Sequence, residues 1–328
     1  MSNSNLPSSS GQNKPNPIQT ASNLLNTRNT AYKPIQYSER ITSINPCAFV
    51  LLLDQSASMR DDLEDNNGVS KSKAEHLALI VNQFLDEIII TCQKTDIIKE
   101  YFEILIIGYG REDKVGNSIV QVAWEGPLED KIWVGVNELR NGSKRKETIS
   151  VPNKQKFGPR VKNEEVNIWI DCYAEGVTPM KEAFMVCKSY LDEWVFNHPN
   201  SFPPIVFNIT DGAATDVDEY EEIADSANEI KNISTSDGNV LLFNFLLSDD
   251  YENLVEYPLL SDRYLFENEA YEAALFDASS PIPASLIKYI QKSGLEEGEI
   301  VKGLVFGNIQ SIMRFLNIGT STLRNNIN

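Results

Sequence analysis

The sequence predicts an α/β fold in which helices flank a doubly wound, mostly parallel, Rossmann-like central sheet. Short, mostly apolar runs occupy residues 49–53, 205–210 and 240–247, as is typical of strands buried on both faces of a parallel sheet. Amphipathic helical patterns lie between these runs, and strands that alternate with helices form βαβ units. Hydrophobic residues make up 41% of the 328 residues, which is enough for a large core.

Acidic and hydroxyl side chains follow the first apolar run. Asp54 comes directly after residues 49–53, and Ser56 and Ser58 follow at alternate positions. Ligands of open α/β sheets bind at the carboxyl ends of the strands, and oxygen ligands at this spacing suit a hard cation such as Mg²⁺. Because Asp and Ser are also common turn residues, the motif by itself fits an ordinary turn equally well.

A helix and two further strands are predicted next. Ser72 and Glu75 match a capping box at the start of a helix, and residues 101–109 and 118–124 predict a buried strand and an edge strand. The apolar face of the helix repeats at helical spacing and consists of Leu77, Val81, Phe84, Leu85, Ile88 and Cys92.

Residues 125–166 are polar and contain several lysines. They predict an irregular excursion above the sheet, with one short helix around residues 130–140, and long irregular segments are usually functional or mobile. Beyond them, Thr178 precedes Pro179 and a helical pattern. Thr178 is therefore predicted as the N-cap of that helix, with Pro179 at its first position. Its hydroxyl could still face a cation.

A second acid follows the strand predicted at residues 205–210. Asp211 ends this run, and Gly212 permits the sharp turn that follows. Asp216 is interpreted as an acidic loop residue close enough to support the site. Three separate stretches thus bring oxygen-bearing side chains to one predicted edge of the sheet, which favours a binding site over chance turn composition.

The C-terminal part predicts a last strand at residues 275–276, a short strand at 303–306 and an amphipathic helix over 308–316 closed by Gly319. We divide the chain into a disordered tail rich in Ser, Asn and Pro over residues 1–42, a main domain over 43–280, and a docked C-terminal extension over 281–328.

The set Asp54-x-Ser56-x-Ser58, Thr178 and Asp211-Gly212 resembles the metal-ion-dependent adhesion site (MIDAS) of von Willebrand factor A (VWA) domains, over roughly residues 45–280. The resemblance implies that the serines and Thr178 contact the ion, that the aspartates act directly or through water, and that one position is open to a partner's carboxylate. Mg²⁺ is the expected ion, with Mn²⁺ or Ca²⁺ as alternatives. Ala57 stands where many members have glycine.

The chain is also similar to stand-alone bacterial cytosolic VWA proteins of the tellurium-resistance-associated type. This similarity rests on the metal set, on residues 279–283 and on residues 314–319. It implies a regulatory adaptor in stress or defence signalling. The partner would be a protein kinase, a metal-dependent phosphatase of the 2C class or a MoxR-type ATPase, the last in a chaperone role.

The charge, the cysteines and the lack of long apolar segments limit the partners and the cellular location that the sequence predicts. A net charge of −18 argues against nucleic acid and anionic membrane surfaces as partners. Four cysteines without paired spacing predict reduced thiols, and the lack of a signal-peptide pattern or a long apolar run predicts a cytoplasmic protein.

Two other classes stay open. In a haloacid-dehalogenase-like phosphatase, Asp54 would be the nucleophile beside Mg²⁺, but Ser56 stands where that chemistry needs a second acid. A serine hydrolase fits less well, because the chain has no G-x-S-x-G elbow and neither His76 nor His198 has an evident acid partner. Both of these belong to the enzyme class. The second open class is a purely structural domain with a vestigial metal site. We expect no enzymatic activity.

Overall fold

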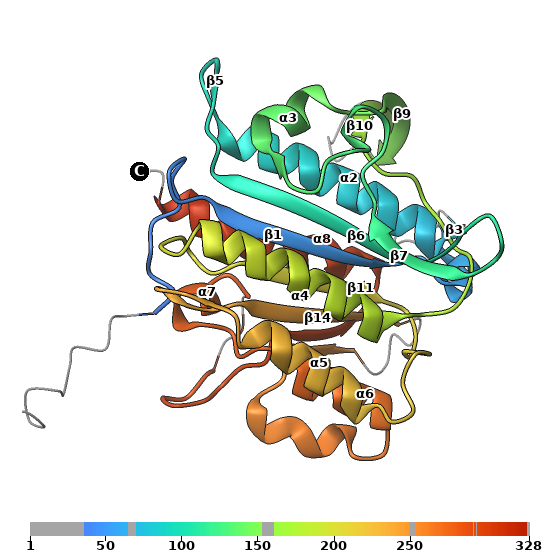
Figure 1. The fold of residues 1–328 in the computed structure, drawn as a ribbon, viewed down its shortest axis with the longest axis vertical. Coiled ribbons are helices and arrows are strands. Elements are labelled where there is room, and N and C mark those ends of the chain that lie inside the picture. The colour runs from blue at the N-terminus through green and yellow to red at the C-terminus, as the bar shows by residue number, and fades with distance from the viewer. Residues whose placement is uncertain are drawn as a thin grey trace, which may run out of the picture. The chain divides into compact units, whose positions relative to one another are not determined.

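An eight-stranded sheet lies at the centre of the fold (Figure 1), in the order β15-β16-β14-β11-β1-β6-β7 with β8 paired to β6. The parallel strands are β1 (Cys47–Asp54), β6 (Phe102–Glu112), β11 (Ile205–Thr210), β14 (Leu241–Leu247) and β16 (Leu304–Gly307). The antiparallel strands are β7 (Ser118–Val122), β8 (Val134–Gly135) and β15 (Val255–Glu256). The predicted mostly parallel α/β sheet is confirmed.

The computed structural model describes residues 36–64, 70–152, 161–248, 254–290, 292 and 294–326. Most of the tail predicted over residues 1–42 lies outside the described residues. Within its last part, the backbone N–H groups of Tyr37, Ser38 and Glu39 donate to Asp237, and Ile41 is buried in the core. The ordered fold therefore begins before the predicted boundary at residue 42.

Strand β1 is buried along its whole length and lies between β6 and β11. Its side chains alternate between two cores: Phe49 and Leu51 enter one, and Val50 and Leu52 enter the other. This two-sided burial is why the strand is one continuous apolar run in the sequence. It also places Asp54 at the carboxyl edge, beside the end of β6.

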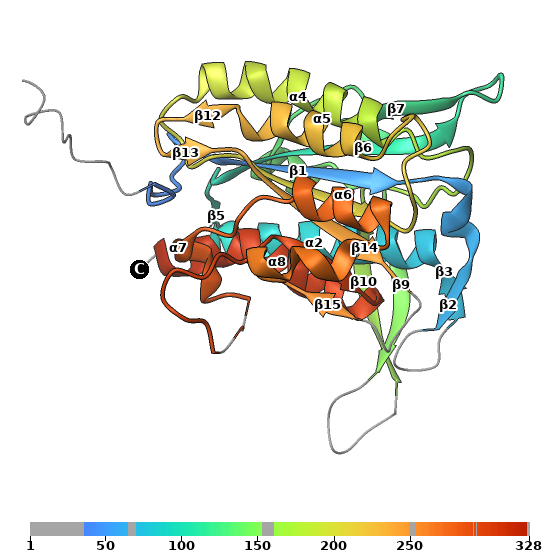
Figure 2. The same ribbon diagram turned by 90° about the horizontal axis from the view of Figure 1, so that it is seen from below.

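Helices cover both faces of the sheet, which Figure 2 shows edge-on. The helices α2 (Lys73–Cys92) and α8 (Ile309–Asn326) pack on one face, and α4 (Met180–Asn197), α5 (Glu221–Lys231) and α6 (Ala270–Ala278) pack on the other. The capping box predicted at Ser72 and Glu75 is confirmed at the start of α2. None of the helices in the described ranges is long and apolar enough to span a bilayer.

Helix α8 is longer than the sequence analysis predicts. It continues through Gly319 instead of ending there. A Cβ on Gly319 would lie 2.8 Å from a ring carbon of Phe49 and 3.2 Å from one of Phe207. The prediction that Gly319 closes the helix is therefore wrong, because this glycine lets the helix approach the sheet closely instead of supplying a C-cap.

The last strand predicted at residues 275–276 is also wrong, because these residues lie within α6. Two apolar residues define no period, and the alanines around them favour a helix. The strand predicted near residues 303–306 is present as β16, which pairs with β14 and β15. Residues beyond 280 therefore contribute a strand to the main sheet.

The region 125–166 is more regular than expected. It contains α3 (Val136–Asn141) and an antiparallel hairpin of β9 (Arg145–Pro152) and β10 (Val161–Ile168). The strands escaped the sequence analysis because they form a separate two-stranded ribbon and carry mostly charged and polar side chains, so they lack the apolar alternation that marks a half-buried strand.

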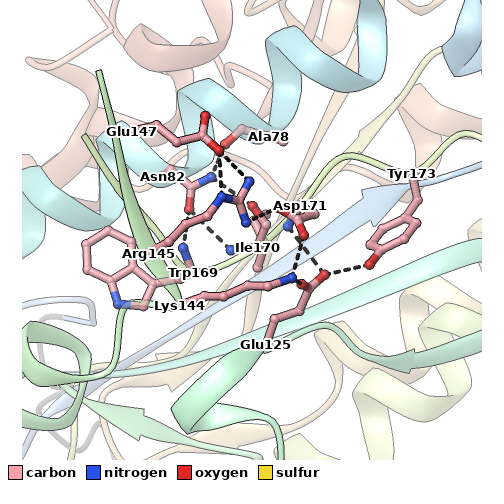
Figure 3. Close-up of polar contacts among 10 residues, drawn as sticks. All are labelled: Ala78, Asn82, Glu125, Lys144, Arg145, Glu147, Trp169, Ile170, Asp171 and Tyr173. Carbon is pink, nitrogen blue, oxygen red and sulfur yellow. Dashed lines mark hydrogen bonds and ion pairs between the residues drawn. The ribbon is translucent and has the colours of Figure 1, made fainter. Parts of the chain in front are cut away.

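Charged side chains fix the base of this hairpin (Figure 3). The Lys144 ammonium bridges Glu125 at 2.5 Å and Asp171 at 2.6 Å, and Arg145 pairs with Asp171 at 2.6 Å. On α2, the Asn82 side-chain oxygen accepts from the Trp169 backbone N–H at 2.8 Å. The hairpin is thus held against α2 at its base.

Candidate metal site at the carboxyl end of the sheet

The turn after β1 is organised around the Asp54 carboxylate, which is 1% exposed. Its Oδ1 accepts from the backbone N–H of Ser56 at 2.8 Å, the side-chain turn that Asp commonly makes two residues on. A 3-10 helix, η1 (Ala57–Arg60), follows and buries Met59. The turn that the sequence predicts is therefore present, and it holds Ser56 and Ser58 at the edge of the sheet.

Hydrogen bonds join these serines to the second acid. The hydroxyl oxygens of Ser56 and Ser58 lie 3.0 Å apart, and Ser58 Oγ donates to Asp211 Oδ1 at 2.6 Å. Asp211 follows β11, the parallel neighbour of β1, so both strands deliver their polar ends to one place. A Cβ on Gly212 would lie 3.7 Å from Ser58 Oγ, which shows how closely the two loops approach.

Thr178 reaches the same edge through its backbone. The loop that carries it is bonded to the turn after β1, since Glu175 N–H donates to Gln55 O at 2.7 Å and Ala57 N–H donates to Gly176 O at 3.0 Å. Thr178 and Thr215 exchange two further bonds: Thr178 N–H donates to Thr215 Oγ1, and Thr215 N–H donates to Thr178 O, each at 3.0 Å. Thr178 itself is 5% exposed.

Asp216, not Thr178, caps helix α4. The helix begins at Met180 with Pro179 as its N-cap residue, so the prediction of Thr178 as N-cap is wrong by one position. The Asp216 carboxylate accepts from the backbone N–H groups of Lys181 at 3.2 Å and Glu182 at 2.8 Å. An acid from a distant loop thereby satisfies two of the open donors at the helix start, a role that local sequence did not reveal.

Thr210 is a site residue that the sequence analysis missed. Its Oγ1 donates to Asp54 Oδ2 at 2.6 Å and accepts from Gly212 N–H at 3.2 Å. Burial raises the pKa of Asp54 to about 6, while the hydrogen bonds from Ser56 and Thr210 act in the opposite direction. The available signal was a hydroxyl residue at the end of a fully buried apolar strand, where an unbonded polar group would be costly.

Lys73, the first residue of α2, is the second site residue that was missed. Its Nζ lies 3.2 Å from Asp211 Oδ2, and the Lys73 side chain is only 8% exposed. A lysine in the first turn of a helix opposes the helix dipole, and that conflict was readable in the sequence. The described chain thus places a buried ammonium against a predicted metal-binding carboxylate.

The donor set fits a hard dication. Its side chains offer carboxylate and hydroxyl oxygens only, as Mg²⁺ prefers. Neighbouring ligands on an octahedral ion with bonds of about 2.1 Å lie about 3.0 Å apart, and the two serine oxygens are separated by that distance. No cluster of three or more His, Cys, Asp or Glu side chains in the described ranges is arranged to hold a metal, so the hydroxyls would have to complete the set.

Comparisons with known proteins give structural similarities only. No protein-family model and no curated protein matches the chain. A proximal thread matrix protein from the mussel byssus aligns with a TM-score of 0.41 and 11% identity, covering 85% of this chain and 48% of that one, so the match spans about half of that protein.

Two further solved structures align at low identity. The vWF domain of the type V pili tip protein Mfa5 from Porphyromonas gingivalis has a TM-score of 0.36 and 8% identity, covering 87% of this chain and 97% of its own. An uncharacterized membrane spanning protein from Vibrio fischeri has a TM-score of 0.20 and 13% identity, covering 61% and 70%. The fold class of this chain rests on the strand order and register of its own sheet.

Proposed function

We propose that this chain is a VWA-type protein-recognition module that binds a divalent cation, Mg²⁺ first and Mn²⁺ or Ca²⁺ as alternatives, through Asp54, Ser56, Ser58, Thr178 and Asp211. The observation that supports this most directly is the chain of contacts from Ser56 through Ser58 to Asp211 across two parallel strands. Residues more than 150 apart in the sequence meet there as oxygen donors.

The residues of the proposed site differ in the charge that they bring to the ion. Asp54 and Asp211 supply negative charge, and the neutral hydroxyls supply oxygen ligands without further charge. The bound dication would supply attraction for an anionic oxygen from outside the chain. A partner's Asp or Glu would then make a charge-assisted contact, stronger than an exposed salt bridge.

The proposed partner is therefore a protein with an exposed acidic side chain. A protein kinase, a 2C-class phosphatase or a MoxR-type ATPase is the candidate partner in a bacterial, cytoplasmic adaptor role in stress or defence signalling. The acidic composition of the chain, with a net charge of −18, makes a metal bridge useful, because direct contact between two acidic surfaces would be repulsive.

The phosphatase alternative is less well supported by the geometry around Asp54. A nucleophilic carboxylate has to reach the phosphorus atom of a substrate, whereas Asp54 is buried and its oxygens accept hydrogen bonds, Oδ1 from Ser56 and Oδ2 from Thr210. An ion needs less room, because a bound water could connect it to this carboxylate. The residue two positions on is Ser56, which is no general acid at neutral pH. We therefore propose a binding role and no catalytic one.

Calorimetric titration of the full chain with Mg²⁺, Mn²⁺ and Ca²⁺ tests the metal site. We expect wild type to bind one ion, and Asp54→Ala and Ser58→Ala to lose that binding while keeping their circular dichroism spectra. Asp192→Ala is the matched control, because it removes a surface carboxylate that pairs with Lys188 on α4.

Affinity purification in Mg²⁺ and in chelator, with wild type and Asp54→Ala as bait, then tests recognition. A partner retained only by wild type in Mg²⁺ supports the proposal. Wild type that binds none of the three ions, and that retains no partner in a metal-dependent way, would refute it.

A further inference from the structure

The Lys73–Asp211 ion pair is the most buried one at the candidate metal site. Nζ lies 3.2 Å from Asp211 Oδ2, and the exposed fractions of the side chains are 8% for Lys73 and 0% for Asp211. A buried ammonium or carboxylate is costly unless it has a partner of opposite charge. Each of these two groups therefore depends on the other.

The position of Lys73 in α2 strengthens this dependence. It is the first residue of the helix, where the unpaired backbone N–H groups create a positive potential. A second positive charge is unfavourable there, and Asp211 is the nearer of the two acids, Asp211 and Asp61, that lie within ion-pair distance of it. The Lys73 ammonium thus stabilises the Asp211 carboxylate, although the start of its own helix disfavours a positive charge.

A dication on Asp211 would meet this ammonium at close range. Like charges only a few ångströms apart in a poorly hydrated site repel strongly. The metal and Lys73 therefore compete for the same carboxylate, unless the ammonium can move away.

Asp61 offers Lys73 a second partner. Its Oδ2 is 3.8 Å from Nζ, and its side chain is 71% exposed. The backbone is already tied at this point, because Lys73 N–H donates to Asp61 O at 3.0 Å. A change of side-chain rotamer alone could carry the ammonium from buried Asp211 to solvated Asp61.

We propose that Lys73 is an internal counter-ion that holds Asp211 in the metal-free site and moves to Asp61 when the metal binds. This inference rests on the proposed metal-binding function and concerns its regulation. It makes the metal affinity of the chain alone weak, because each ion that binds has to displace a buried ammonium.

The same charges define the ligand that the loaded site takes. With Lys73 paired to Asp61, the charges of Asp54 and Asp211 balance the dication, and a carboxylate from a partner would bind by direct ligation of the ion. The metal and the partner's Asp or Glu therefore bind cooperatively, and each strengthens the binding of the other by the same factor. The chain would hold its metal tightly only in complex with an acidic partner.

Calorimetric Mg²⁺ and Mn²⁺ titrations of the full chain test this competition with three variants. Lys73→Met should bind metal about tenfold more tightly or better, since it removes the repelling charge, and Asp61→Asn should bind a few-fold more weakly. Lys188→Met removes an ammonium that pairs with Asp192 on α4, and it should bind as wild type does.

Thermal unfolding without metal provides a readout independent of affinity. Lys73→Met should melt at a lower temperature than wild type because the buried Asp211 carboxylate loses its opposite charge, and Mg²⁺ should restore more of its stability than it adds to wild type. If Lys73→Met does not fold, Lys73→Gln carries the same expectations with a polar side chain.

The outcomes separate this inference from the function on which it rests. Metal affinity of the Lys73 variants within twofold of wild type would overturn the counter-ion role and leave the metal site standing. Absence of binding by wild type and by every variant would overturn both.

Discussion

At the residue scale, the site depends on polar side chains that are buried and fully engaged. Asp54 accepts one hydrogen bond from the Ser56 backbone N–H and one from the Thr210 hydroxyl. Both donor residues are themselves buried. Such a network is rigid when all its members are satisfied and costly when one is removed. The carboxylate is thereby fixed in orientation, so the proposed ion would not have to order it.

Thr210→Val tests this orienting role. Valine keeps the shape of threonine but removes the hydroxyl that donates to Asp54 Oδ2 at 2.6 Å, so the variant should lose about 1–3 kcal/mol of unfolding free energy and bind Mg²⁺ more weakly. Urea denaturation and calorimetry measure the two effects. Ser226→Ala, which removes a hydroxyl bonded to a helix carbonyl on α5, should change neither by more than about 0.5 kcal/mol. Wild-type behaviour of Thr210→Val would contradict the role.

At the element scale, the strands were predictable and the outer elements were not. Almost every residue of β1, β11 and β14 is buried. Their apolar runs follow directly from a sheet that is covered on both faces. The hairpin of β9 and β10 lies outside the main sheet, and its polar strands carry no such signal. The extent of α8 depended on how close it approaches Phe49, a tertiary contact that no local pattern contains.

Gly319→Ala measures that close approach. Alanine would gain helix propensity, worth about 1 kcal/mol, but its Cβ would lie 2.8 Å from a ring carbon of buried Phe49. The forced shift of the helix or the ring should outweigh the gain, with a net loss of about 1–3 kcal/mol in unfolding free energy. Chemical denaturation gives the value, and equal or higher stability of the variant would show that α8 is free to move outward.

At the scale of the whole molecule, four of the residues that meet at the candidate site were predictable from the sequence, and the residues that support them were not. Asp54, Ser56, Ser58 and Asp211 follow two apolar runs whose ends were predicted at one edge of the sheet, and the structure makes these strands parallel neighbours and joins the residues by hydrogen bonds. Thr210, Asp216 and Lys73 act through contacts with residues that lie up to 156 positions away. Their roles arise only when the chain folds, because the residue that each of them bonds or pairs with is distant in sequence.

The balance of charge across the molecule also includes a buried cation that is not part of the candidate metal site. Lys302 is 6% exposed and its Nζ lies 5.2 Å from the centre of the Phe276 ring. Burial lowers its pKa to about 8, and the nearby Lys231 ammonium acts in the same direction. Because the folded pKa is below that of an unfolded lysine, the unfolded state holds this proton more tightly.

Lys302→Met should therefore stabilise the fold in a pH-dependent way. Below pH 8, where both states of wild type carry the proton, the full cost of burying the charge applies, so the variant should be more stable by about 1–3 kcal/mol. Between pH 8 and about 10.5 the folded wild type loses the proton first, its stability rises relative to the variant, and the difference should shrink. Urea denaturation of both proteins at pH 7 and pH 9.5 measures the change.

Lys188→Met is the control, because Asp192 raises the pKa of Lys188 in the folded protein. The stability difference between this variant and wild type should stay constant over the same pH range. A constant difference for Lys302→Met would show that its ammonium is stabilised in the fold as well as it is in water.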